Sequence, residues 1–131
     1  MKETIKIAAA LAFTGLALTA NAQPDAAFPS RPITIVIPYP AGGTSDAQVR
    51  MFQDALGKAL GQPVIVDNKP GASGAIAAQA VMRAKPDGHT LLYPNNGVVI
   101  APLLNKTAGY DALKDFKPVT QVTAVPMVLV T

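Results

Sequence analysis

Apolar residues in the middle of the chain follow two alternating spacings. Nearly continuous apolar runs of strand length occur three times, and each precedes a segment with apolar residues at helical spacing. The predicted strands cover about residues 33–39, 64–66 and 90–93. The predicted helices cover about residues 46–60, 75–84 and 98–105. This alternation predicts an α/β fold with a parallel sheet and right-handed crossovers.

Two of the helical segments predict a face that packs on the sheet. In residues 46–60 this face comprises Val49, Phe52, Ala55, Leu56 and Ala59. In residues 75–84 it comprises Ile76, Ala77, Ala80, Val81 and Ala84. Gly61 and Pro63 form a typical stop after the first helix. Further along, residues 110–116 predict one helical turn and residues 119–131 an extended segment.

The loop after the first strand, residues 38–46, has the sequence PYPAGGTSD. Its small residues Ala41, Gly42 and Gly43 would let a ligand approach the backbone closely. Because the loop leads into a helix N-terminus, it predicts unpaired backbone N–H groups that face a small anion. A simple tight turn from strand to helix explains the same residues, and both interpretations stay open. The loop lacks the spacing of a Walker A loop, a dinucleotide-binding fingerprint or a nucleophile elbow.

Two polar side chains stand at the predicted start of the first helix. Ser45 predicts an N-cap, and Gln48 three residues later completes a capping-box pattern. A carboxylate in the first turn of a helix interacts favourably with the helix macrodipole and stabilises the helix by about 0.3–1 kcal/mol. We therefore expect the role of Asp46 to be mainly structural. Beside an anionic ligand, Asp46 would act through water or through a ligand amine or hydroxyl.

Two more loops of similar character follow the second and third predicted strands. Residues 71–74 have the sequence GASG, and residues 94–97 have the sequence PNNG. In parallel sheets ligands bind outside the carboxyl ends of the strands, so all three loops should gather on one edge. G-x-x-G alone is a weak motif. The repeated unit of strand, glycine-bearing loop and helix is the stronger signal.

His89 is the only histidine. Together with Ser45 and either Asp67 or Asp87, it fits the chain order of a hydrolase triad. However, His89 precedes the third strand next to a turn, which places it at the opposite end of the strand from the loops. That geometry argues against a triad and for a structural histidine.

Composition narrows the function classes further. The formal net charge is +3 at pH 7, and the basic residues are scattered without aromatic residues between them, so nucleic-acid binding is not indicated. The chain has no cysteine, which excludes thiol catalysis and thiolate metal sites, and one histidine makes a metal cluster improbable. We therefore expect no cofactor and no metal, and stability that comes from the hydrophobic core. We also expect the chain to be a monomer.

Residues 1–22 match a secretory signal peptide. Lys2 and Lys6 form a basic start, residues 7–19 are apolar without charge, and residues 20–22 read ANA, a small-residue cleavage site. A membrane anchor is the rival interpretation, but the apolar run is short for a bilayer, which takes about 20 residues. The sequence predicts cleavage between Ala22 and Gln23 and export of residues 23–131 as one small domain.

Four motifs together resemble a known family. They are PYPAGG at residues 38–43 with Asp46 and Arg50, VDNKPGASG at 66–74, PDGHTLL at 86–92, and Tyr110-Asp111 with Asp115-Phe116. At these spacings the chain resembles the Bug, or TctC-like, solute receptors of tripartite tricarboxylate transporters. The family commonly has an aromatic residue where His89 stands, which is a mild departure in a turn.

The resemblance implies a lobe of the periplasmic-binding-protein (type 2) fold and no catalysis. Its ligand would be a small organic anion, mostly a carboxylate, bound between two lobes, and its partners the membrane permease subunits. Backbone donors in the first loop and in residues 71–74 would hold the ligand, with residues 95–97 as weaker candidates. The implied ligand-binding residues are Tyr39, Ala41, Gly42, Gly43, Thr44, Asp46, Gly71, Ala72, Ser73, Gly74, Asn95 and Gly97.

Members of that family are much longer, and their second lobe follows the extended segment that here ends at Thr131. We therefore expect a truncated receptor that lacks the hinge and the opposing half of the cleft. Such a half cleft should bind carboxylates poorly, and micromolar binding in isothermal titration would contradict this. The alternatives are an exported α/β hydrolase or transferase fragment, or a degenerate fragment without function that exposes apolar surface at residues 125–130.

Overall fold

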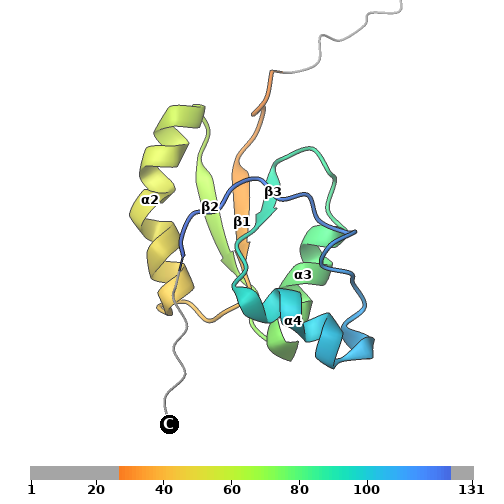
Figure 1. Ribbon diagram of the computed structural model, residues 1–131. Coiled ribbons are helices and arrows are strands. Elements are labelled where there is room, and N and C mark those ends of the chain that lie inside the picture. The colour runs from red at the N-terminus through yellow and green to blue at the C-terminus, as the bar shows by residue number, and fades with distance from the viewer. Residues whose placement is uncertain (1–26, 125–131) are drawn as a thin grey trace, which may run out of the picture.

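The computed structural model describes residues 27–124 (Figure 1). The strands are β1 (Ile33–Ile37), β2 (Val64–Asn68) and β3 (Thr90–Leu92). The helices are α2 (Thr44–Leu60), α3 (Ala75–Met82) and α4 (Asn96–Leu104), with 3-10 turns η1 (Ala72–Gly74) and η2 (Lys106–Ala108). The predicted signal peptide, its cleavage point and the apolar residues 125–130 lie outside the described residues.

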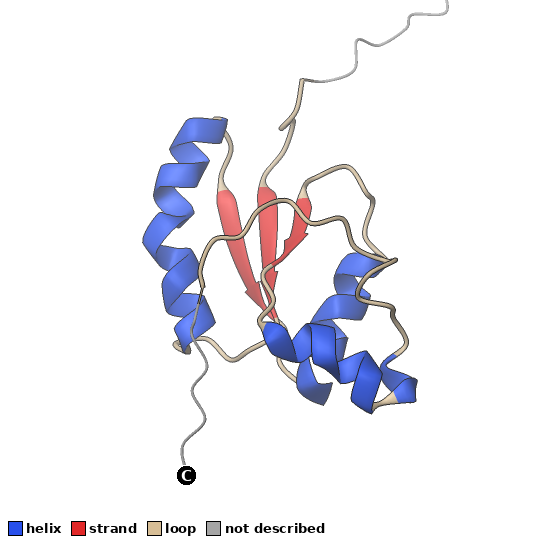
Figure 2. Cartoon of the chain, viewed as in Figure 1, coloured by secondary structure: helices blue, strands red, loops and turns tan. Residues whose placement is uncertain are grey.

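The three strands form one parallel sheet in the order β2-β1-β3. β1 pairs with β2 over its whole length, from Ile33 opposite Val64 to Ile37 opposite Asn68. Helix α2 lies on one side of the strands, and α3 and α4 lie on the other (Figure 2). The predicted α/β fold with a parallel sheet is confirmed.

The central strand β1 is buried because helices cover both of its faces. Ile35 and Ile37 pack with Val49 of α2 on one face, while the alternate residue Val36 points to the other. Burying a side chain of this size contributes about 1.5–3 kcal/mol, so β1 anchors the fold. On the opposite face the small residues Ala75 and Ala78 of α3 build a second core cluster together with α4.

Helix α2 departs from the prediction at its start and on its face. Its N-cap is Gly43, so Ser45 lies inside the first turn and the predicted capping box is wrong. Gln48 instead accepts a hydrogen bond from the Tyr93 hydroxyl (3.0 Å). Ala55 and Ala59 are exposed, because the contact face is narrower than the apolar spacing suggested. The predicted stop after residue 60 is confirmed.

The inner face of α3 also differs from the prediction. Ala75, Ala77 and Ala78 are the buried residues, whereas Ile76 is half exposed. Ile76 turns back over the preceding loop, where its Cδ1 lies 2.6 Å from the position of a Cβ on Gly71. Small residues face the sheet, so the one large residue covers the loop instead.

The last part of the described chain contains little regular structure. Residues 110–116 contain the predicted single helical turn, closed by the Asp115 N–H on the Asp111 carbonyl (3.0 Å). The Asp111 carboxylate also accepts the N–H groups of Leu113 (3.0 Å) and Lys114 (3.2 Å). Residues 119–124 form no strand, and η2 was not predicted. Within residues 27–124, every helix is too short or too polar to cross a bilayer.

Candidate functional site

The three loops that follow the strands meet at one edge of the sheet, as predicted. The Lys69 N–H donates to the Ile37 carbonyl (2.8 Å), and the Tyr93 N–H donates to the Val36 carbonyl (2.9 Å). The second and third loops therefore leave the sheet on either side of the first. This carboxyl edge is where ligands bind in open parallel sheets.

The Asp46 carboxylate connects the parts of this edge. Its Oδ2 accepts the Gly42 N–H (2.9 Å) and the Arg50 Nε–H (2.8 Å), and its Oδ1 accepts the Asn68 Nδ2–H (3.1 Å). The same Asn68 amide also donates to the Tyr39 carbonyl (3.1 Å). One buried carboxylate thus ties the first loop to α2 and to the end of β2.

These partners hold the pKa of the Asp46 carboxyl at about 2, below its usual 3.8. The hydrogen bond from Arg50 is the largest cause, followed by the N–H of Gly42, while burial opposes both. Asp46 is therefore ionised at neutral pH. Its place in the first turn of α2 fits the predicted macrodipole role, but the side-chain network goes beyond that role.

Two of the three small residues in the first loop use their N–H groups internally. Gly42 donates to Asp46, and Gly43 donates to the Pro40 carbonyl (3.3 Å). The expectation that Ala41, Gly42 and Gly43 all offer free donors therefore fails for the two glycines. Asp46 competes for the donor that an incoming anion would otherwise use.

Open donors remain at the N-terminus of α2. The first bond within the helix runs from the Ala47 N–H to the Gly43 carbonyl (2.9 Å). The N–H groups of Thr44, Ser45 and Asp46 therefore lack intrahelical acceptors, and no side chain caps this end. A Cβ on Gly42 would meet nothing within 4 Å, so the adjoining loop faces open space.

The second loop has an unusual backbone. Ala72 and Ser73 adopt left-handed φ angles of 48° and 54°, and both are exposed. Gly74 (φ 92°) is buried, and a Cβ there would lie 2.8 Å from Val98 Cγ2 and 3.3 Å from Pro38 Cβ. Gly74 therefore lets α3, α4 and the first loop pack closely, while Ala72 and Ser73 project toward solvent.

The third loop is joined to the first by Tyr39. The Asn95 Oδ1 accepts the Gly97 N–H (2.8 Å), which caps α4, and it also accepts the Tyr39 hydroxyl. A Cβ on Gly97 would lie 2.9 Å from that oxygen, so only glycine leaves this arrangement undisturbed. Burial raises the pKa of Tyr39 above 10, so its hydroxyl stays a donor at neutral pH.

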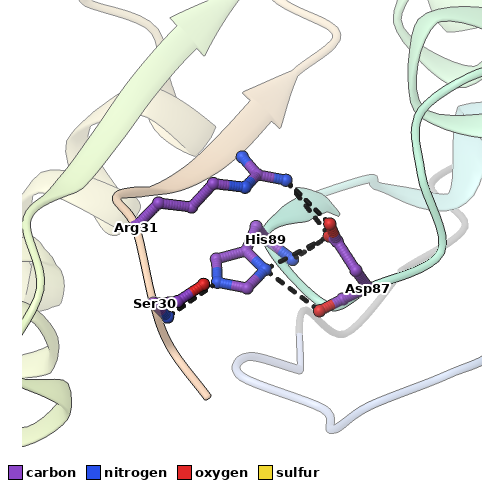
Figure 3. A network of polar contacts seen from close by, with 4 residues as sticks. All are labelled: Ser30, Arg31, Asp87 and His89. Atoms are coloured by element: carbon purple, nitrogen blue, oxygen red, sulfur yellow. Dashed lines mark hydrogen bonds and ion pairs between the residues drawn. The ribbon is translucent and has the colours of Figure 1, made fainter. Parts of the chain in front are cut away.

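The opposite end of the sheet holds a second polar cluster (Figure 3). Buried His89 accepts the Ser30 N–H on Nε2 (3.2 Å), and its Nδ1 lies 3.2 Å from Asp87 Oδ1. Asp87 also accepts Arg31 Nη2 (2.9 Å) and the His89 N–H (3.1 Å), and Phe28 packs edge-on against the imidazole. Both ring nitrogens are engaged in fixing the chain segment that leads into β1.

The structure does not bring the imagined triad together. Ser45 lies in α2 at the carboxyl edge, and His89 precedes β3 at the amino edge. Asp67 is in β2, where it pairs with Lys69 (3.0 Å). Among the described residues, no group of three or more acidic, cysteine or histidine side chains is placed to hold a metal.

Sequence reasoning missed the bridging role of Asn68 and the Gln48–Tyr93 contact. The Asp46–Arg50 pair was detectable in principle, because opposite charges four residues apart meet on a helix. The reach of Asn68 from β2 depends on strand register, which the sequence pattern does not reveal.

A family model described as "Tripartite tricarboxylate transporter family receptor" matches residues 48–131. The chain belongs to this family. A UPF0065 protein of Bordetella bronchiseptica is 51% identical over 115 residues, which cover 87% of this chain and 34% of that protein. The chain spans about a third of the length of the curated relatives it matches.

Two solved structures share this fold. The periplasmic binding protein BugD matches with a TM-score of 0.66 and 40% identity, over 70% of this chain and 30% of its own. MatC of Rhodopseudomonas palustris with bound malate matches with a TM-score of 0.65 and 39% identity, over 70% of this chain and 31% of its own. The fold is therefore that of periplasmic solute-binding receptors.

Proposed function

We propose that this chain acts as an exported solute receptor and that the carboxyl edge of its sheet forms one wall of a carboxylate site. The open N–H groups of Ala41, Thr44 and Ser45 would hold one carboxylate, and those of Ala72 and Ser73 would approach it from the second loop. The remaining expected contacts would border the ligand: Tyr39, Gly42, Gly43, Asp46, Gly71, Gly74, Asn95 and Gly97.

The observation that carries this proposal is the uncapped N-terminus of α2 beside a loop open to solvent. Its donors lack intrahelical acceptors, and the positive end of the helix dipole adds attraction for an anion. The family membership supports a receptor role, and the related MatC contains malate. A dicarboxylate of that size is therefore the first probe to use.

The setting would be the periplasm. Cleavage between Ala22 and Gln23 would release the receptor, which would deliver its ligand to the permease subunits of a tripartite tricarboxylate transporter. The lobe formed by residues 27–124 would offer one wall of the site, so most of a bound ligand would stay in water. We expect a Kd of about 1 mM or weaker for this chain alone.

The test is an amide chemical-shift titration of the purified chain with malate, with its neutral dimethyl ester as the matched control. Malate should shift the amides of Ala41, Thr44, Ser45 and Ser73 with one common Kd, and the ester should not. The amide of His89 at the opposite edge should not move. The absence of a malate response, or an equal response to the ester, would contradict the proposal.

A further inference from the structure

Asp46 presents an electrostatic problem for an anion site. Its carboxylate lies in the first turn of the helix that would bind the anion, and two like charges within a few ångströms repel. Yet the side chain is only 4% exposed, and donors from three places in the fold surround it. Its oxygens therefore face donors within the protein rather than solvent.

The donors around Asp46 are the ones that define the shape of the edge. The Gly42 N–H belongs to the first loop, Arg50 to the second turn of α2, and Asn68 to the end of β2. Hydrogen bonds to an ionised acceptor are shorter and stronger than neutral ones. The Arg50 guanidinium also offsets the negative charge. Asp46 thus occupies the Gly42 N–H to fix the loop and leaves the N–H groups of Ala41 and Thr44 to the ligand.

We infer that Asp46 is the positioning residue of the carboxylate site, which holds the Gly42 turn and the end of β2 so that the N–H groups of Ala41 and Thr44 face the ligand. This inference rests on the proposed function. Asn68 extends the effect, because the amide that contacts Asp46 also holds the Tyr39 carbonyl. The loop is then set from both of its ends.

The two interpretations of Asp46 predict opposite signs. If it acted only as a nearby negative charge, Asp46→Asn would strengthen anion binding by removing repulsion. If it positions the loop, the same variant should weaken binding, because an amide in its place turns a donor toward the donors that surround it. Whether Asp46→Asn raises or lowers the Kd therefore distinguishes a positioning role of Asp46 from an effect of its charge alone.

The chain supplies a matched control in Asp87. Its carboxylate likewise accepts an arginine and a backbone N–H, but at the opposite edge of the sheet. Asp87→Asn removes the same charge from a comparable set of partners, so it reports any general effect of charge or stability on binding.

The experiment is the amide-shift titration with malate, applied to the wild-type chain and to three variants. Asp46→Asn and Asp87→Asn each remove one negative charge, whereas Asn68→Ala leaves the charge unchanged. We expect the Kd to rise at least 10-fold for Asp46→Asn and by a smaller factor for Asn68→Ala, and to stay within twofold for Asp87→Asn. The Gly42 amide proton should also exchange faster in Asp46→Asn without ligand. If Asp46→Asn does not fold, the positioning role is tested by comparing the other two variants. Asn68→Ala should then weaken malate binding more than Asp87→Asn does.

The outcomes separate the two claims. If wild-type chain responds to malate and Asp46→Asn binds equally or more tightly, the positioning role is wrong while the carboxylate site stands. If the wild-type chain shows no response, the proposed function is wrong and the inference falls with it. Equal weakening by Asp46→Asn and Asp87→Asn would reduce Asp46 to a general stabilising residue.

Discussion

Both edges of the sheet contain an aspartate with similar partners, but the two aspartates serve different purposes. At each edge an aspartate accepts an arginine and a backbone N–H, and the pKa of both Asp46 and Asp87 is held at about 2. Asp46 is 4% exposed and Asp87 38% exposed. The carboxylates alone do not distinguish a binding edge from a structural one.

The difference lies in which backbone donors remain open beside each aspartate. At the amino edge, the N–H groups of Ser30 and His89 are both taken, by the imidazole and by Asp87. At the carboxyl edge, Asp46 takes one N–H and leaves the first turn of α2 uncapped. A saturated edge fixes the chain, whereas an edge with aligned open donors can bind an anion.

Glycine-to-alanine substitutions should show that the carboxyl edge is the more tightly built. Gly74→Ala combines a left-handed backbone with contact against Val98 and Pro38, so we expect a loss of about 3 kcal/mol of unfolding free energy. Gly88→Ala (φ 80°) meets the ring of Phe28, which is 59% exposed and so can shift toward solvent, and about 1–2 kcal/mol should be lost.

Urea denaturation of both variants gives these values. Circular dichroism should show native helix content in both at low urea. Equal losses would mean that the two edges are packed with similar tolerance, and the contrast drawn from the contacts of Gly74 would not hold.

Acid should weaken both edges together. The folded-state pKa of Asp46 and of Asp87 is lowered from 3.8 to about 2, mainly by Arg50 and Arg31 respectively. A lowered pKa stabilises the fold above the unfolded value, and this stabilisation disappears as the pH falls from about 4 to about 2. Unfolding free energy should therefore fall through this window.

The pH series can be divided between the two edges. Urea midpoints measured from pH 6 to pH 2 should fall less steeply in Asp46→Asn and in Asp87→Asn than in the wild-type chain, since each variant lacks one of the linked groups. A wild-type chain with constant stability from pH 4 to pH 2 would contradict the lowered pKa values.

The sequence pattern was sufficient for the framework and for the edge. Apolar runs and helical spacing located β1, β2 and β3, and parallel order then required the loops to meet. The pattern could not decide how the loop donors are used, because the Asp46 side chain and a ligand compete for the same Gly42 N–H. That competition depends on side-chain geometry rather than on residue type.

Two local predictions were wrong because each depended on the backbone next to the predicted residue. Ser45 is a good N-cap residue, but the chain enters the helix earlier, with Gly43 in an extended conformation at the cap. Ile76 was assigned to the core by its spacing, but the bare backbone at Gly71 gives its side chain a place above the loop. Only in the second case does the absence of a side chain on a glycine explain where the predicted residue lies.

The smallest expected difference between the two edges of the sheet comes from backbone strain. Among the described residues, the non-glycine residues with left-handed φ are Ala72 and Ser73, both at the carboxyl edge. Relieving that strain in Ser73→Gly should raise the unfolding free energy by about 0.5–1 kcal/mol, after allowing for the greater freedom of glycine in the unfolded chain. The same substitution at the amino edge, Ser30→Gly, relieves no such strain and should lower it by about 0.5 kcal/mol. Urea denaturation decides between them, and a gain from Ser30→Gly equal to that from Ser73→Gly would show that strain is not confined to the binding edge.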